Sequence, residues 1–188
     1  DEFMRASFEL RRATSLGPWG AEIALNGRVE AIRARAGEFT LGRATIDLDV
    51  QRPVGRDRLV MRTIAAGASG PRVPTQFETW FGGPVSAPGY NFHVLRGRAG
   101  VSQRVEWQHP VRGPSIPLGR YGRAPGEIVL APFGTVVWTD GRTSSQSTAQ
   151  QRGLYPSAGV AAIGLFNLLR VDVARGLRDG RWLATVDV

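Results

Sequence analysis

Few residues in this chain have the types and spacing that catalysis or metal binding requires. His93 and His109 stand 16 residues apart, and neither has a second histidine or a cysteine near it. A protein zinc site takes three or four His, Cys or carboxylate ligands. We therefore expect structural or surface roles for both histidines and no bound metal.

Two further features could carry chemistry. Asp47 and Asp49 share one face of an alternating segment, where paired carboxylates could act as acid and base. In a barrel they would instead face arginines such as Arg62 or Arg104, and we expect this structural pairing. The glycine-rich run from Gly119 to Gly126 opens no helix, so it matches neither a Walker loop nor a dinucleotide fingerprint. We therefore expect no enzyme activity and no cofactor.

The composition excludes several other classes of protein. The chain has no cysteine, which excludes disulfides and thiolate catalysis. All 24 basic residues are arginine, and they outnumber the 16 carboxylates, which gives a net charge of +8. These arginines are dispersed and form no basic stripe between exposed aromatic residues, so we expect no nucleic acid partner. A surface that faces the phosphates of membrane lipid or lipopolysaccharide explains the charge as well.

Alternation of apolar and polar residues predicts an all-β chain. From Arg43 to Gln51, Ala44, Ile46, Leu48 and Val50 alternate with polar residues, and the same period of two recurs along the 188 residues. This length corresponds to one domain, and no apolar run is long enough for a membrane-spanning helix.

Two positions leave the strand count at nine or ten. Asn26-Gly27 predicts either a hairpin turn or a bulge within one long strand. Pro132 lies inside the expected strand from Glu127 to Thr139, and it favours an edge strand or a bulge.

Two closed architectures fit this alternation. In a soluble sandwich or small barrel the apolar face is the core, whereas in an outer-membrane barrel it faces lipid and the ionic face lines the lumen. The strand lengths and the aromatic residues near strand ends favour the membrane barrel. The expected interface aromatics are Trp19, Trp107, Trp138, Tyr155 and Trp182. The ionic residues expected to pair in the lumen are Asp47, Asp49, Arg104, Glu106, Arg170 and Asp172.

The stretch from Gln76 to Tyr90, QFETWFGGPVSAPGY, resembles the long inward-folding loop of the bacterial surface antigen family. These are outer-membrane β-barrels that assemble or secrete other proteins. Five strands should follow that loop, and five alternating segments do. The residues from Leu168 to Trp182 are also similar to the family's penultimate strand and final hairpin.

The resemblance implies an antiparallel β-barrel of the outer-membrane type with an inward loop at residues 67–93. The residues expected to shape this loop are Gly82, Gly83, Pro88, Gly89 and Tyr90. In the family an Arg precedes the Gly-Tyr of the loop and pairs with an Asp on a neighbouring strand. Here Pro88 and Thr135 stand at these places, so both halves of the ion pair are missing together. This departure puts transport or insertion activity in question more than the fold.

The resemblance also implies a location and a role. We expect residues 1–188 to be the C-terminal barrel region of a longer chain in the bacterial outer membrane, with other chains or the missing barrel strands completing the sheet. Its role would be protein assembly or export, or the anchoring of a partner domain. The alternative is a non-catalytic, β-rich structural subunit, periplasmic or membrane-peripheral, that binds a larger assembly through a sheet edge or the loop at 67–93.

Overall fold

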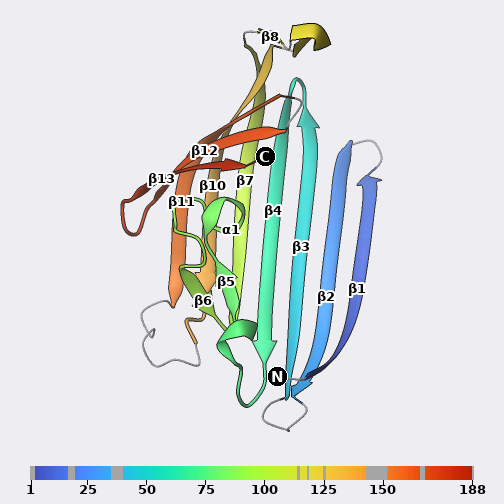
Figure 1. Ribbon diagram of the computed structural model, residues 1–188, viewed down its shortest axis with the longest axis vertical. Coiled ribbons are helices and arrows are strands. Elements are labelled where there is room, and N and C mark those ends of the chain that lie inside the picture. The colour runs from blue at the N-terminus through green and yellow to red at the C-terminus, as the bar shows by residue number, and fades with distance from the viewer. Residues whose placement is uncertain are drawn as a thin grey trace.

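The computed structural model describes residues 3–16, 20–34, 40–113, 115–117, 119–124, 126–142, 152–165 and 168–187. One antiparallel sheet of nine strands dominates these residues (Figure 1). Its strands are β1 (Phe3–Leu16), β2 (Ala21–Ala34), β3 (Thr40–Val54), β4 (Asp57–Ser69), β7 (Ala99–Arg112), β10 (Glu127–Thr139), β11 (Gly153–Gly164), β12 (Leu169–Gly176) and β13 (Trp182–Asp187). The expected all-β, antiparallel architecture is confirmed.

Strands that follow one another in this sheet pair with one another. The order is β1-β2-β3-β4-β7-β10-β11-β12-β13, and every pairing is antiparallel. The expected β3–β4 hairpin turns through Gly55 and Arg56, where Gly55 adopts a φ of 64° that a side chain would strain. Within the described residues β1 and β13 are the two edges and do not pair with each other, so the sheet is open there.

Short elements occupy the connections. Residues 70–98 join β4 to β7 and contain η2 (Thr75–Phe77), α1 (Gly83–Ser86) and the ribbon of β5 (Thr79–Phe81) with β6 (Leu95–Gly97). Between β7 and β10 lie η3 (Gly119–Tyr121) and the ribbon of β8 (Ile116–Pro117) with β9 (Arg123–Ala124). No helix among the described residues has the length and apolar character needed to cross a membrane.

Both ambiguous positions lie inside long strands. Asn26-Gly27 forms neither a turn nor a bulge, because β2 pairs in continuous register with β1 and β3 through both residues. The expected edge position of Pro132 is wrong, since β10 lies between β7 and β11. The β7 ladder instead skips Ala131 and Pro132, which accommodates the missing N–H of proline, while Pro132 still lies opposite Val160 on β11.

Register divides the side chains of the sheet between two faces. We call the side carrying residues 70–98 the inner face and the opposite side the outer face. Along β10, Ala131, Phe133, Thr135, Val137 and Thr139 are buried on the inner face, while the residues between them are exposed on the outer face. The sheet curves around the inner face, and α1 and β5 lie in its hollow (Figure 1).

Two clusters of buried apolar residues lie on this inner face. The first joins the loop to the sheet and consists of Phe81, Ala87, Tyr90, Leu95, Val137 and Tyr155. The second lies on β10, β11 and β12 and consists of Ala131, Phe133, Ala161, Ile163 and Ala174. The core of the molecule is therefore the hollow of the sheet and the loop that fills it.

Candidate functional site

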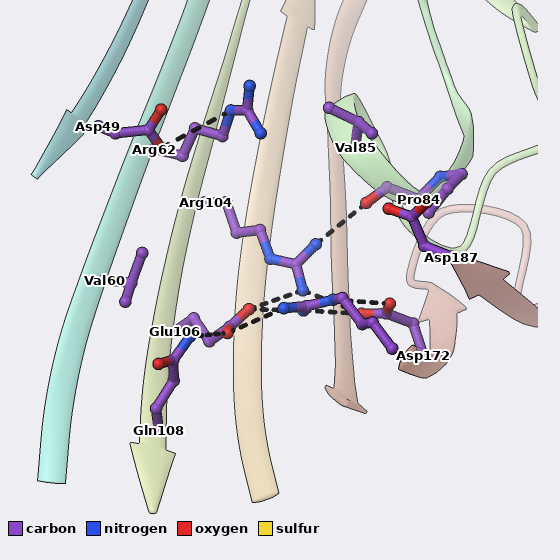
Figure 2. Close-up of a pocket in the computed structure, with 11 residues that line it drawn as sticks. Asp49, Val60, Arg62, Pro84, Val85, Arg104, Glu106, Gln108, Asp172 and Asp187 are labelled. Atoms are coloured by element: carbon purple, nitrogen blue, oxygen red, sulfur yellow. Dashed lines mark hydrogen bonds and ion pairs between the residues drawn. The ribbon is translucent and has the colours of Figure 1, made fainter. Parts of the chain in front are cut away.

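The centre of the inner face holds a buried network of four charged side chains. Arg104 and Glu106 come from β7, and Arg170 and Asp172 from β12. The Arg104 guanidinium lies 2.8 Å from Glu106 and 3.0 Å from Asp172 through the same Nη2. Arg170 lies 2.7 Å from Glu106 and 2.9 Å from Asp172. Each arginine thus bridges both carboxylates (Figure 2), and all four residues are among those expected to pair in the lumen.

This network depends on the curvature of the sheet. β10 and β11 separate β7 from β12, which places the two pairs of residues three interstrand spacings apart along the sheet. At about 4.8 Å per spacing the distance along a flat sheet is roughly 14 Å, too far for direct contact. The observed contacts near 3 Å therefore require the sheet to bend, and they hold it bent.

Arg104 also fastens the loop to the sheet. Its Nη1 donates a hydrogen bond of 3.0 Å to the carbonyl oxygen of Pro84 in α1, and its guanidinium carbon lies 3.9 Å from the Phe133 ring centroid. A backbone carbonyl is a weaker partner than a carboxylate, so this contact orients the loop without adding a charge to it. Pro84 and Val85 border the same cavity as the ionic network, and the volume of this cavity is about 170 Å³.

Residues 86–90 of the loop are held by neutral contacts. The Tyr90 hydroxyl donates to the carbonyl of Pro156 on β11 at 2.8 Å, and burial raises the pKa of this phenol, so it remains a neutral donor. Ser102 of β7 donates to the carbonyl of Ser86. Gly89 lies so close to β12 that a Cβ atom there would stand 2.6 Å from the nitrogen of Gly176.

The other residues expected to shape the loop lie in the same segment. Gly82 and Gly83 have φ values of 137° and 75°, conformations that favour glycine. Both are buried, Gly82 just before α1 and Gly83 as its first residue. Pro88 is buried as well. Thr135 is buried on β10, and no described residue hydrogen-bonds its hydroxyl. The loop therefore lies in the hollow even without the ion pair of the family it resembles. Pro88 stands where that family's loop has an arginine, and Thr135 stands where its neighbouring strand has an aspartate.

Asp47 and Asp49 form a second, more exposed ionic group with Arg62. Arg62 lies 2.6 Å from Asp47 and 3.8 Å from Asp49, on neighbouring strands β3 and β4. Figure 2 shows Asp49 and Arg62 on the border of the same cavity as the buried network. The expected pairing of both aspartates with Arg62 is thus present, whereas Arg104 makes its ion pairs with Glu106 and Asp172.

The expected interface aromatics divide between the two faces. Trp107, Trp138 and Trp182 are on the outer face, with 39%, 39% and 63% of their surface exposed. Trp138 lies opposite Val101, six residues before Trp107 on β7, so the two rings are about 20 Å apart along the strand. The outward position expected for Tyr155 is wrong, because its register places it on the inner face, where it packs edge-on against Tyr90. Trp19 lies outside the described residues.

Neither histidine belongs to a metal site within the described residues. His109 lies on the outer face with its Nδ1 2.6 Å from Asp57, and His93 stacks on the ring of Phe92. No group of three or more candidate ligands comes together in this part of the chain.

Sequence reasoning missed several residues that complete the site. Gln108 donates a hydrogen bond to Glu106 at 2.8 Å. Two further residues bind the loop, since Ser102 donates to Ser86 and the Pro156 carbonyl accepts from Tyr90. The alternation of β7 carried a signal for Gln108 and Ser102, since both share the face of Arg104. No sequence pattern marks the Pro156 carbonyl.

Searches with the whole chain found no matching protein-family model and no matching curated protein.

Proposed function

We propose that this chain is an outer-membrane β-barrel region of the surface antigen type, which serves protein assembly or export or anchors a partner domain. One observation carries the proposal: burial is inverted relative to a soluble β protein. Arg104, Glu106 and Asp172 are at most 7% exposed, while Ile46 and Val105 are 48% and 42% exposed. Large apolar side chains on an open face need a non-aqueous surrounding, and hydrocarbon supplies it.

The outer face of β3 to β13 supports this reading by its continuity. Between its ends the register places apolar or small side chains there, within the described residues. The two polar exceptions in mid-sheet are Thr63 and Gln103, which hydrogen-bond to each other. Thr63 donates to Gln103 at 2.6 Å, and the Gln103 amide donates to the carbonyl of Arg104 at 3.2 Å. Such internal pairing lowers the cost of polar groups in lipid.

The inner loop supports the surface antigen type in particular. Residues 82–90 fill the hollow, as the resemblance implies, and five strands of the large sheet follow them. The wall arginine Arg104 and the neutral Tyr90 contact hold the loop in the absence of the family's loop arginine. In this proposal, strands that pair with β1 and β13 close the barrel.

The test compares two single cysteines at matched heights on opposite faces. Ile46 and Asn26 are both exposed and lie on neighbouring strands one residue apart in register, Ile46 outward and Asn26 inward. Because the chain has no cysteine, Ile46→Cys and Asn26→Cys each carry one reactive site. In phosphatidylcholine vesicles we expect a charged, membrane-impermeant maleimide to label Asn26→Cys at least tenfold faster than Ile46→Cys. Equal rates in urea are the control, and equal rates in vesicles would refute the proposal.

A second candidate is the β-rich subunit that binds a larger assembly. Within the described residues β1 and β13 each pair with a strand on one side only, which favours it, since each then offers a row of backbone groups to a further strand. This role predicts a soluble chain whose Ile46→Cys variant is labelled as fast as the Asn26→Cys variant without any lipid.

A further inference from the structure

The outer face of β3 to β13 carries ionisable side chains only near strand ends, within the described residues. They are Arg52, Asp57, His109 and Arg175. Three of them, Arg52, Asp57 and His109, gather at the β3–β4 hairpin. Trp107 is in the same cluster, since both Arg52 and Trp107 lie opposite Leu59 from the two sides. We call these four residues with Arg56 of the turn the hairpin cluster.

The hairpin cluster is organised by its carboxylate. One oxygen of Asp57 accepts a hydrogen bond of 2.9 Å from the Trp107 indole N–H, and the other lies 2.6 Å from Nδ1 of His109. Both oxygens are therefore engaged from β7. The indole is fixed with its polar edge toward the hairpin, as in tryptophans at membrane interfaces.

The charges of the cluster favour an anion. Two guanidinium groups, Arg52 and Arg56, accompany the single carboxylate of Asp57, and both arginines are exposed. Guanidinium groups bind phosphate oxygens with two parallel hydrogen bonds. Directly below on the same face lie Leu59, Met61 and Val105, the start of the apolar surface. A ligand that fits both parts has a phosphate attached to an apolar chain.

We propose that the hairpin cluster binds the headgroup phosphate of an anionic phospholipid, whose acyl chains lie on the adjoining apolar surface. This inference rests on the proposed membrane location of the outer face. Arg52 and Arg56 hold the phosphate, and Trp107 and His109 flank it at the level where headgroup meets hydrocarbon. The lipid becomes a specific ligand because a zwitterionic headgroup carries a compensating positive charge that the two arginines repel.

The test counts bound lipid on the whole chain released from detergent micelles in a native mass spectrometer. The probes are phosphatidylglycerol and phosphatidylcholine at equal concentration. We expect the unchanged chain to retain phosphatidylglycerol at least fivefold over phosphatidylcholine, and 0.5 M salt during loading to reduce this preference by screening. In the variant Arg52→Gln/Arg56→Gln the preference should fall at least fivefold.

The matched control removes the same charge elsewhere. Arg11→Gln/Arg142→Gln replaces two other exposed arginines, one on the inner face of β1 and one after β10. This control should keep the preference of the unchanged chain. An equal loss in both double variants, or no preference in the unchanged chain, would overturn the headgroup site. Cysteine labelling in phosphatidylcholine vesicles tests the membrane location separately. A chain that inserts normally but shows no lipid preference would therefore refute the headgroup site and leave the proposed function standing.

Discussion

At the scale of single residues, the chain's ionic chemistry is structural. Arg104 and Arg170 share Glu106 and Asp172 in a closed set, and both carboxylates are almost fully buried. A buried ion pair gains little over an apolar pair of the same shape, whereas one buried charge left alone is costly. The main effect of the network is therefore to specify how β7 and β12 are arranged in the sheet, and its contribution to stability is smaller.

This view predicts an asymmetry between single and double substitutions. Asp172→Asn leaves two guanidinium groups to one carboxylate, so we expect it to lower the unfolding free energy by about 3–5 kcal/mol. The double variant Arg104→Met/Asp172→Leu leaves Arg170 paired with Glu106 alone, so we expect a smaller decrease in the unfolding free energy. Urea unfolding of the vesicle-folded chain measures both values.

The comparison needs an exposed pair as its reference. Glu9 and Arg11 lie 2.7 Å apart on β1, and Arg11 is three-quarters exposed. Glu9→Gln should therefore change the unfolding free energy by only about 0–1 kcal/mol. A loss for Asp172→Asn as small as that for Glu9→Gln would mean that water reaches the network freely.

At the scale of elements, the loop is held where two glycine backbones meet. Gly89 has a φ of 88°, and a Cβ atom there would stand 2.6 Å from the nitrogen of Gly176 on β12. Both the backbone conformation and the close approach exclude a side chain, because the atoms in the way belong to the backbone of a paired strand. The seat of the loop thus depends on these two residues, 87 positions apart.

Gly89→Ala should therefore release the loop without unfolding the sheet. The substitution adds strain of about 1–3 kcal/mol to the seated loop. We expect faster hydrogen exchange in residues 82–94 and unchanged exchange in β7 and β10. Gly27→Ala is the control, since no atom lies within 4 Å of its Cβ position and its φ is not in the left-handed range. Unchanged exchange in the loop of Gly89→Ala would show that other contacts alone seat it.

The sequence predicted the strands better than the contacts between them. Alternation located the large strands and the β3–β4 hairpin, because a period of two is a local property. It also selected Arg104, Glu106, Arg170 and Asp172 by face, yet it could not show that they form one network, since that follows from curvature. The contact between Gly89 and Gly176 could not be predicted for the same reason, since these residues are 87 positions apart and no local pattern marks it.

Three local expectations failed for identifiable reasons. Asn26-Gly27 is a strong turn signal, but the pairing of β2 on both sides outweighs a propensity of about 1 kcal/mol. Pro132 was expected at an edge or a bulge, but a two-residue gap in one ladder accommodates it within a central strand. The outward position expected for Tyr155 failed because nearness to a strand end does not specify a face.

At the scale of the whole molecule, the inverted burial and the open edges constrain each other. In the proposed membrane location, hydrocarbon around the outer face would remove the cost of its exposed apolar side chains. The same hydrocarbon would make unpaired backbone groups on β1 and β13 cost several kcal/mol each. A sheet of nine strands in lipid therefore has to pair both edges, with further strands or with another copy of itself.

This constraint predicts how the chain behaves when it inserts alone. In vesicles we expect the amides of β1 and β13 to exchange as slowly as those of the doubly paired β7, and light scattering in mild detergent to give a mass of at least two copies. Pairing between copies would then protect the edge amides of β1 and β13 from exchange. Dilution in detergent should therefore lower the mass and speed exchange at β1 and β13 together. Strand β7 should stay protected and serves as the internal control. A monodisperse monomer without detergent, with fast exchange confined to β1 and β13, would contradict the membrane location. The exposed apolar face would then have to be a surface for a soluble partner, and the edges the sites where that partner adds a strand.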